Sequence, residues 1–132
     1  NAAALFCAAE ALGCSGETVR EVLDGFRGLE HRLEKFAESN GISFVNDSKS
    51  TTPASLLWAL DRYPDKSVVL IAGGKAKSKD FGDLKPRIRQ KVKRAVLIGE
   101  ARDMIRRSWE GATEILEAAD LDAACVLSLE RV

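Results

Sequence analysis

The first 27 residues carry the apolar spacing of two short helices. Small and apolar residues recur at helical intervals from Ala2 to Leu12, and Gly13 is a typical stop. Ser15 can cap a second helix, whose apolar residues through Phe26 share one face. Such a helical hairpin has too little apolar surface to fold alone. We therefore expect it to be the tail of a preceding domain that the chain does not contain.

Two short runs with strand-like character come next. Leu33–Ser39 and Ile42–Asn46 flank the pair Asn40-Gly41, and both of these residues tolerate the positive φ of a type I′ turn. The pattern predicts a β-hairpin, preceded by a linker over residues 28–32.

From Pro53 onward, amphipathic and continuous apolar runs alternate. Pro53 suits the first turn of a helix. Strands are expected at 67–72, 95–98 and 113–116, and further helices at 84–92, at 101–109 and from 121. This alternation predicts an α/β fold: a Rossmann-like, mostly parallel sheet with helices on both faces. The last helix reaches Val132 without a closing strand, so we expect the domain to be truncated before its last strand.

Composition narrows the class of protein. Twenty basic residues balance twenty acidic ones, so no net field favours nucleic acid or an anionic membrane. No apolar run approaches the roughly 18 to 20 residues of a membrane span. The three cysteines form no CxxC pair and are expected to be buried, reduced thiols of a cytosolic protein. With His31 as the single histidine, no metal site is expected.

Two further expectations concern packing. The basic stretch at 85–94 is expected to be a solvated helix face, because it lacks the aromatic residues that stack on nucleic acid. Trp58 and Trp109 are expected to pack against the sheet.

Polar loops follow two of the predicted strands, where ligands bind in an open α/β sheet. In the first loop Asp47, Lys49 and Thr51 alternate, so an extended chain would aim them to one side. The second loop, residues 73–77, combines two glycines for close backbone approach with two lysines. The side chains of these two loops suit a ligand with carboxylate or phosphate groups. Neither loop has the Walker A or GxGxxG spacing.

Simpler interpretations of these residues stay open. Asp47 and Ser48 could form a turn, and Thr51 or Thr52 could cap the next helix. Arg32 and the lysines could be ordinary surface residues.

Three motifs in their joint spacing resemble the Mur ligase family of peptidoglycan synthesis: GLEHRLE at 28–34, NDSKSTTP at 46–53 and LIAGGKAKSKDF at 70–81. The resemblance covers nearly the whole chain and is strongest to the branch that adds D-glutamate. It implies a cytoplasmic, ATP-dependent ligase that joins D-glutamate to UDP-N-acetylmuramoyl-L-alanine through an acyl phosphate. Mg²⁺ would offset the phosphate charge.

The resemblance also implies roles for single residues on the ATP side. Asn1 matches a family asparagine near the adenine. Arg32 matches the linker arginine that reaches the ATP phosphates, and Asp47 matches the aspartate that binds the ribose.

On the amino-acid side, Lys49 matches a lysine of the active-site cleft. Thr51 and Lys77 match positions that hold the carboxylates of D-glutamate.

The same comparison implies two domains. Residues 1–28 resemble the end of the central ATPase domain, and residues 29–132 resemble the C-terminal domain that binds the incoming amino acid. The family's Walker-type loop, its magnesium ligands and a later loop of the D-glutamate pocket lie outside the chain. We therefore expect no ligase activity from the chain alone, with ATP and Mg²⁺ held mainly by the missing parts.

Two alternatives remain at this stage. One is a free-standing α/β module that binds an anionic metabolite or nucleotide. The other is a different ATP-dependent amide ligase of the same superfamily, against which the NDSKST run argues.

Overall fold

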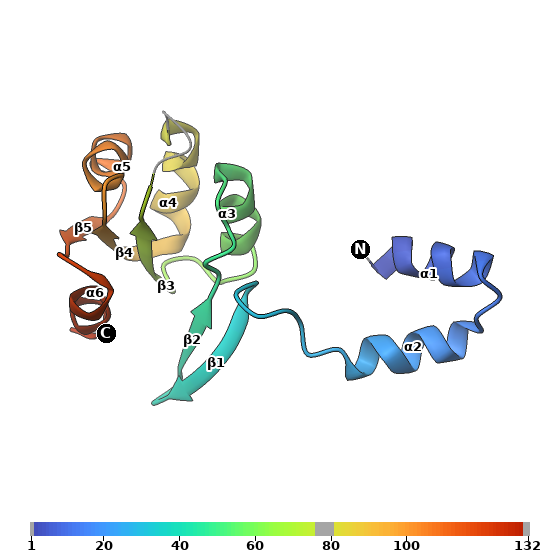
Figure 1. The fold of residues 1–132 in the computed structure, drawn as a ribbon. Coiled ribbons are helices and arrows are strands. Elements are labelled where there is room, and N and C mark those ends of the chain that lie inside the picture. Colours follow the sequence, from blue (N-terminus) through green and yellow to red (C-terminus); the bar gives the residue numbers. More distant parts are fainter. Residues whose placement is uncertain (1, 76–80, 131–132) are drawn as a thin grey trace. The chain divides into compact units, whose positions relative to one another are not determined.

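The computed structural model describes residues 2–75 and 81–130 (Figure 1). The chain divides into two compact units, Asn1–Asp47 and Ser48–Val132. The first unit contains a pair of helices and a β-hairpin, and the second contains a parallel sheet with its helices.

Helices α1 (Ala2–Ala11) and α2 (Gly16–Gly25) pack against each other, as the apolar spacing predicts. Ser15 caps α2: its hydroxyl accepts a hydrogen bond from the backbone N–H of Thr18 at 3.2 Å. This bond satisfies one of the N–H groups that the first turn of a helix leaves without an intrahelical partner.

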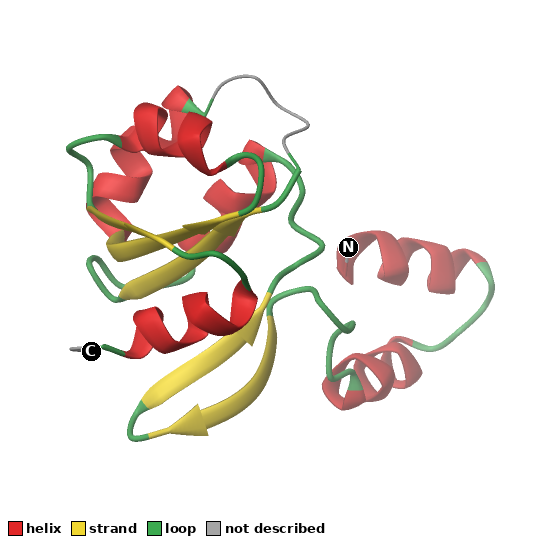
Figure 2. Cartoon of the chain, turned by 60° about the vertical axis from the view of Figure 1, so that its left-hand side comes forward, coloured by secondary structure: helices red, strands yellow, loops and turns green. Residues whose placement is uncertain are grey.

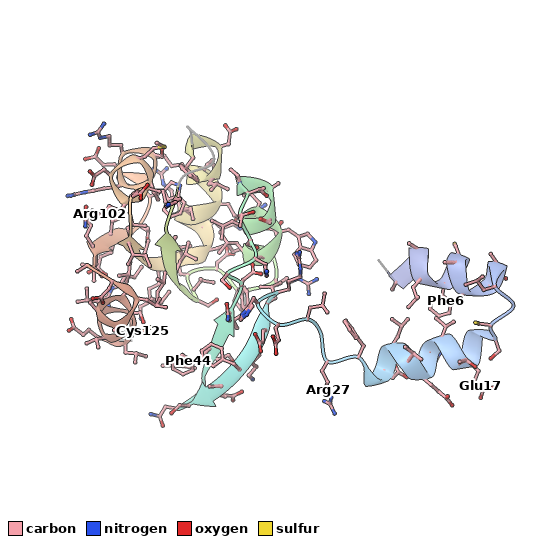
Figure 3. The ribbon with its side chains drawn as sticks, viewed as in Figure 1. Phe6, Glu17, Arg27, Phe44, Arg102 and Cys125 are labelled. Carbon is pink, nitrogen blue, oxygen red and sulfur yellow. The ribbon has the colours of Figure 1, made fainter. Side chains whose placement is uncertain are left out.

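The prediction of buried thiols is wrong, since all three cysteines are free and exposed. Cys7 and Cys14 belong to the helical pair, where few residues are covered and Leu12 keeps 83% of its surface exposed. Cys125 projects from α6 (Leu121–Leu129), where the neighbouring Ala124 takes the fully buried position (Figure 3). Successive residues of a helix are turned by about 100°, so burying Ala124 turns Cys125 away from the sheet.

The β-hairpin forms as predicted. Strands β1 (Glu34–Ser39) and β2 (Ile42–Asn46) pair antiparallel, from Ser39 opposite Ile42 to Glu34 opposite Asn46. Asn40 and Gly41 form the turn with φ of 51° and 77°, the left-handed values that a type I′ turn requires.

The second unit is built on three parallel strands in the order β3-β4-β5. The strands are β3 (Val68–Gly73), β4 (Val92–Ile98) and β5 (Glu114–Glu117), and the helices are α3 (Pro53–Leu60), α4 (Lys85–Lys91), α5 (Arg102–Trp109) and α6, with a 3₁₀ turn η1 (Gly82–Leu84) before α4. Figure 2 shows α3, α4 and α5 on one face of the sheet and α6 on the other. The predicted α/β fold with helices on both faces is therefore confirmed.

The core is centred on β4. Ala95, Val96 and Leu97 have no exposed surface, which is why this strand is a continuous apolar run. Because side chains alternate along a strand, Leu97 packs with Trp109 and Ile88 on one face, while Val96 packs under α6 on the other. Trp109 thus lies in the core as expected. Trp58 lies outside the core, since 59% of it is exposed. The guanidinium of Arg62 stacks over the Trp58 ring, with Cζ 3.8 Å from the ring centroid.

The basic stretch is not one solvated helix face. Helix α4 ends at Lys91 and β4 begins at Val92, three residues before the predicted start of that strand. Arg94 is only 8% exposed: its Nε donates to Glu114 Oε2 on β5 at 2.7 Å, and its Nη1 donates to the carbonyl of Glu130. An arginine whose charge and donors are satisfied by neighbours can occupy a buried strand position, which an alternation of charged residues does not reveal.

A network of polar contacts connects the segments that precede β3 and β4. Lys91 Nζ lies 2.8 Å from Asp65 Oδ1 and donates to the carbonyl of Tyr63 at 2.9 Å. The side-chain amide of Gln90 donates to Asp65 Oδ2 at 3.2 Å. The loop before β3 is thereby joined to the end of α4.

We expect the Asp65 contacts to make stability depend on pH. The hydrogen bond from Lys91, followed by that from Gln90, holds the pKa of Asp65 below its ordinary value of 3.8. The folded state is therefore favoured while Asp65 is ionised, and this contribution disappears as the pH falls through 3.8 and below. Thermal melts should give a higher Tm for wild type than for Asp65→Asn near pH 7, and the difference in Tm should disappear towards pH 3. In a Lys91→Met background, the difference in Tm caused by Asp65→Asn should be smaller at neutral pH. A difference in Tm that grows as the pH falls would contradict the assignment.

Candidate functional site

The carboxyl ends of β3 and β4 are held together by a glycine-lined contact. The N–H of Gly74 donates to the carbonyl of Ile98 at 3.1 Å, and the N–H of Ala101 donates to the carbonyl of Gly74 at 2.9 Å. A Cβ on Gly73 would lie 1.9 Å from the Ile98 oxygen, and one on Gly99 would lie 2.9 Å from Gly74 Cα. The close backbone approach at these glycines is therefore made to the neighbouring strand, whereas the sequence suggested an approach to a ligand.

On the two sides of the segment 76–80, Gly74 and Phe81 are hydrogen-bonded to other elements of the second unit. Gly74 is bonded to the end of β4, as described above, and Lys75 follows it as an exposed residue. At the other side, the carbonyl of Phe81 accepts a hydrogen bond from Trp109 Nε1 at 3.1 Å. Lys77 lies within the segment and so falls outside the described residues.

The loop after β2 carries three of the predicted site residues. The chain turns at Ser48 and Lys49, so the expectation of an extended loop that aims Asp47, Lys49 and Thr51 to one side is wrong. Lys49 and Thr51 are exposed and open the second unit.

Thr52, and not Thr51, caps helix α3. The hydroxyl of Thr52 accepts from the N–H of Ser55, and the hydroxyl of Ser55 accepts from the N–H of Thr52, both at 3.2 Å. This reciprocal pair is a capping box. Thr51 is therefore not required for the cap.

Asp47 is bound to the linker, which in the structure extends to Leu33 because β1 begins at Glu34. Its Oδ1 accepts a hydrogen bond from the backbone N–H of Leu33 at 3.0 Å. One residue earlier, the side-chain amide nitrogen of Asn46 lies 2.8 Å from His31 Nδ1. The backbone N–H of His31 donates to Glu34 Oε2 at 2.9 Å. These contacts bring the linker to the end of the hairpin.

The linker has an uncommon backbone that the sequence did not indicate. His31 and Leu33 have φ of 63° and 47°, and Arg32 between them is exposed. A left-handed conformation costs a non-glycine residue roughly 1–2 kcal/mol. Such residues keep this conformation only where neighbouring contacts enforce it. Leucine has no preference for this region, so no local signal could have predicted it.

The predicted site residues thus fall into three groups. Arg32 and Asp47 belong to the first unit and are joined through Leu33. Lys49 and Thr51 begin the second unit. Asn1 and Lys77 lie outside the described residues.

Two kinds of feature are absent from the described residues. Within residues 2–75 and 81–130, no three His, Cys, Asp or Glu side chains lie together in a way that could hold a metal ion. In the same part of the chain, no helix is both long enough and apolar enough to cross a membrane.

Strand β2 belongs to the hairpin and not to the parallel sheet, so the loop that follows β2 is not a loop at the carboxyl end of a strand of that sheet. The three parallel strands with helices on both faces, and with glycine turns after β3 and β4, place the second unit in the class of open α/β domains. Comparison with known families specifies which one. Residues 31–132 match the family described as "Mur ligase, glutamate ligase domain", and the chain belongs to this family. The family expected from the three motifs is therefore confirmed.

Individual relatives extend the match over the first helices. The UDP-N-acetylmuramoylalanine–D-glutamate ligase of Aquifex aeolicus is 45% identical over 130 residues, which cover 98% of this chain and 31% of the relative. The ligases of the same name from Chlorobium limicola and Acidobacterium capsulatum are 43% and 39% identical, over 98% and 97% of this chain and 28% of each relative. The chain spans about three-tenths of the length of these relatives.

Proposed function

We propose that this chain is the C-terminal, amino-acid-binding part of an ATP-dependent ligase that adds D-glutamate to UDP-N-acetylmuramoyl-L-alanine. The observation that carries the proposal is the 45% identity to a D-glutamate ligase over 98% of the chain. In the proposed reaction ATP converts the substrate carboxyl into an acyl phosphate. The amine of D-glutamate then displaces phosphate and forms the amide. The enzyme would act in the cytoplasm, in the synthesis of peptidoglycan precursors.

On the ATP side, we assign Arg32 to the phosphates, Asp47 to the ribose and Asn1 to the adenine. The chemistry supports the first two assignments, because a guanidinium binds phosphate oxygens and a carboxylate accepts from ribose hydroxyls. Arg32 is exposed and lies in the linker to which Asp47 is hydrogen-bonded.

On the amino-acid side, we assign Thr51 and Lys77 to the carboxylates of D-glutamate and Lys49 to the active-site cleft. Ammonium and hydroxyl groups are suitable donors for carboxylate oxygens. The capping box at Thr52 is compatible with this role of Thr51, because Thr52 caps α3 and the Thr51 hydroxyl is not needed for the cap.

The proposed domain boundary lies at residues 28–29. Residues 1–28 would be the end of an ATPase domain, and residues 29–132 the C-terminal domain. Large apolar side chains of the helical pair support this assignment, since Leu12, Val22 and Phe26 are 83%, 61% and 59% exposed. Surface of this kind is typical of elements that pack against a further part of a protein. ATP and Mg²⁺ would be held mainly by that part.

The proposal is tested in the full-length protein that carries this chain. We expect phosphate release from ATP to require both UDP-N-acetylmuramoyl-L-alanine and D-glutamate, with L-glutamate and L-lysine inactive. Lys77→Ala should raise the KM for D-glutamate by about 10- to 100-fold, the range of a lost charge-assisted hydrogen bond. Lys75→Ala, two residues away, should stay within about twofold of wild type and is the matched control.

Other outcomes would contradict particular parts of the proposal. Turnover with L-lysine in place of D-glutamate would overturn the substrate and keep the ATP chemistry. Equal effects of Lys75→Ala and Lys77→Ala would overturn the assignment of Lys77. ATP turnover by the 132-residue chain alone would overturn the expectation that this part is inactive by itself.

A further inference from the structure

Two side chains at the end of β2 hold the linker on both sides of Arg32. Asn46 contacts His31 Nδ1 at 2.8 Å, and Asp47 accepts from the N–H of Leu33 at 3.0 Å. The two partners are consecutive in β2 and the loop that follows it, and the two linker residues differ by two positions. Arg32 is therefore the one residue enclosed between the contacts. We call the pairs His31–Asn46 and Leu33–Asp47 the linker clasp.

We propose that His31 and Asn46 are positioning residues, and that the linker clasp sets the direction in which Arg32 leaves the linker. This inference rests on the proposed function, which assigns Arg32 to the ATP phosphates. A guanidinium that is already oriented before the ligand binds loses less conformational freedom on binding than one on a mobile segment. The backbone of Arg32 is held further by its own N–H, which donates to the carbonyl of Leu29 at 3.2 Å.

The backbone conformation shows why a clasp is needed. His31 and Leu33 both have left-handed φ, which is uncommon for any residue other than glycine and is least favourable for a bulky residue such as leucine. Without the contacts, each residue would return to the ordinary extended or right-handed region. Either rotation turns the peptide groups on one side of Arg32 and redirects its side chain. Loss of the clasp should therefore impair the use of ATP and not the affinity for the amino acid.

The hairpin itself does not depend on the clasp. Its strands are joined by their own ladder and by the Asn40-Gly41 turn, at the opposite end from Asn46. A variant at Asn46 can therefore lose the contact with His31 and still form the hairpin. This independence makes the positioning role separable from a structural one.

The test uses the full-length enzyme and a double-mutant cycle. Leucine is similar in size to asparagine but has no amide. Asn46→Leu should therefore lower kcat/KM for ATP by about tenfold, which corresponds to a loss of about 1.4 kcal/mol in transition-state stabilisation at 25 °C. The KM for D-glutamate should change by less than about twofold. In an Arg32→Ala background, Asn46→Leu should have little further effect, because it acts through Arg32. Additive losses would overturn the proposal.

Substitutions of His31 provide a matched pair. Asn places a polar atom at the position of Nδ1 and tolerates left-handed φ, so His31→Asn should stay within about threefold of wild type. Leu lacks both properties, so His31→Leu should repeat the tenfold loss seen for Asn46→Leu. Equal losses in the two variants would overturn the positioning role and indicate direct contact of His31 with the substrate.

Amide hydrogen exchange separates this inference from the proposed function. The N–H groups of His31 and Leu33 are bonded to Glu34 and Asp47, and should exchange slowly in wild type. If the His31–Asn46 contact holds the linker in place, both should exchange faster in Asn46→Leu. If the wild type shows no turnover with D-glutamate, the proposed function fails, and the exchange result still decides whether the clasp exists. If the wild type is active and exchange at both amides is unchanged in Asn46→Leu, the clasp is overturned alone.

Discussion

Gly73→Ala is expected to lower the free energy of unfolding of the second unit by about 4 kcal/mol. The added Cβ would lie 1.9 Å from the carbonyl oxygen of Ile98, a backbone atom that cannot move without displacing β4. Overpacking costs about 1–3 kcal/mol, and the φ of 143° adds backbone strain of similar size for any residue with a Cβ. The measurement is urea unfolding of the full chain, followed by tryptophan fluorescence.

The adjacent glycine provides the control for Gly73→Ala. Gly74 also has positive φ, at 90°, but a Cβ there would have no atom within 4 Å. Gly74→Ala should therefore cost only the backbone strain, about 1–2 kcal/mol. Comparable losses in the two variants would show that the contact between the ends of β3 and β4 is looser than described, and that strain alone explains both glycines.

Trp109→Ala is expected to destabilise the second unit by about 3–5 kcal/mol, the usual cost of removing a buried aromatic side chain. Trp109 is 1% exposed, packs in the cluster that contains Leu97 and Ile88, and donates from Nε1 to the carbonyl of Phe81. Trp109→Phe should keep most of the apolar contact and lose the hydrogen bond, which leaves a cost of about 1–3 kcal/mol.

The second tryptophan is the matched control for Trp109. Trp58 is 59% exposed, and its described aromatic contact is the stack with Arg62. Exposed cation–π pairs contribute about 0.5–1 kcal/mol, so Trp58→Ala should stay near that value. A loss at Trp58 as large as that at Trp109 would mean that Trp58 is covered in solution.

Local sequence was sufficient to predict most of the secondary structure. The Asn40-Gly41 turn, the cap at Ser15 and the start of α3 at Pro53 depend on backbone preferences that each residue carries with it. The strand at 68–73 was evident because its side chains are apolar throughout, and these partly buried side chains pack into the clusters on both faces of the sheet. Errors arose at element ends, as at Val92, where a charged pair interrupted the apolar pattern of β4.

The candidate site was predictable in its residues and not in its arrangement. The three motifs name Arg32, Asp47, Lys49 and Thr51, and the family they indicate is confirmed. That Thr52 caps α3 depends on which hydroxyl meets the first turn, a choice between two identical neighbouring side chains. That Asp47 accepts from Leu33 depends on residues 14 positions apart in the chain.

By itself, the sequence determined the order of helices and strands, the α/β class and the family of this protein, because turn residues, periodicity and motif spacing are local properties. Only the tertiary structure decided the burial of Arg94, the exposure of Cys125 and the left-handed backbone of Leu33. Each of these depends on which distant groups meet: a glutamate on the next strand, the face of the sheet under α6, or a carboxylate at the end of the hairpin. The clasp around Arg32 belongs to this second group, because it exists only when the hairpin brings the linker and the end of β2 together.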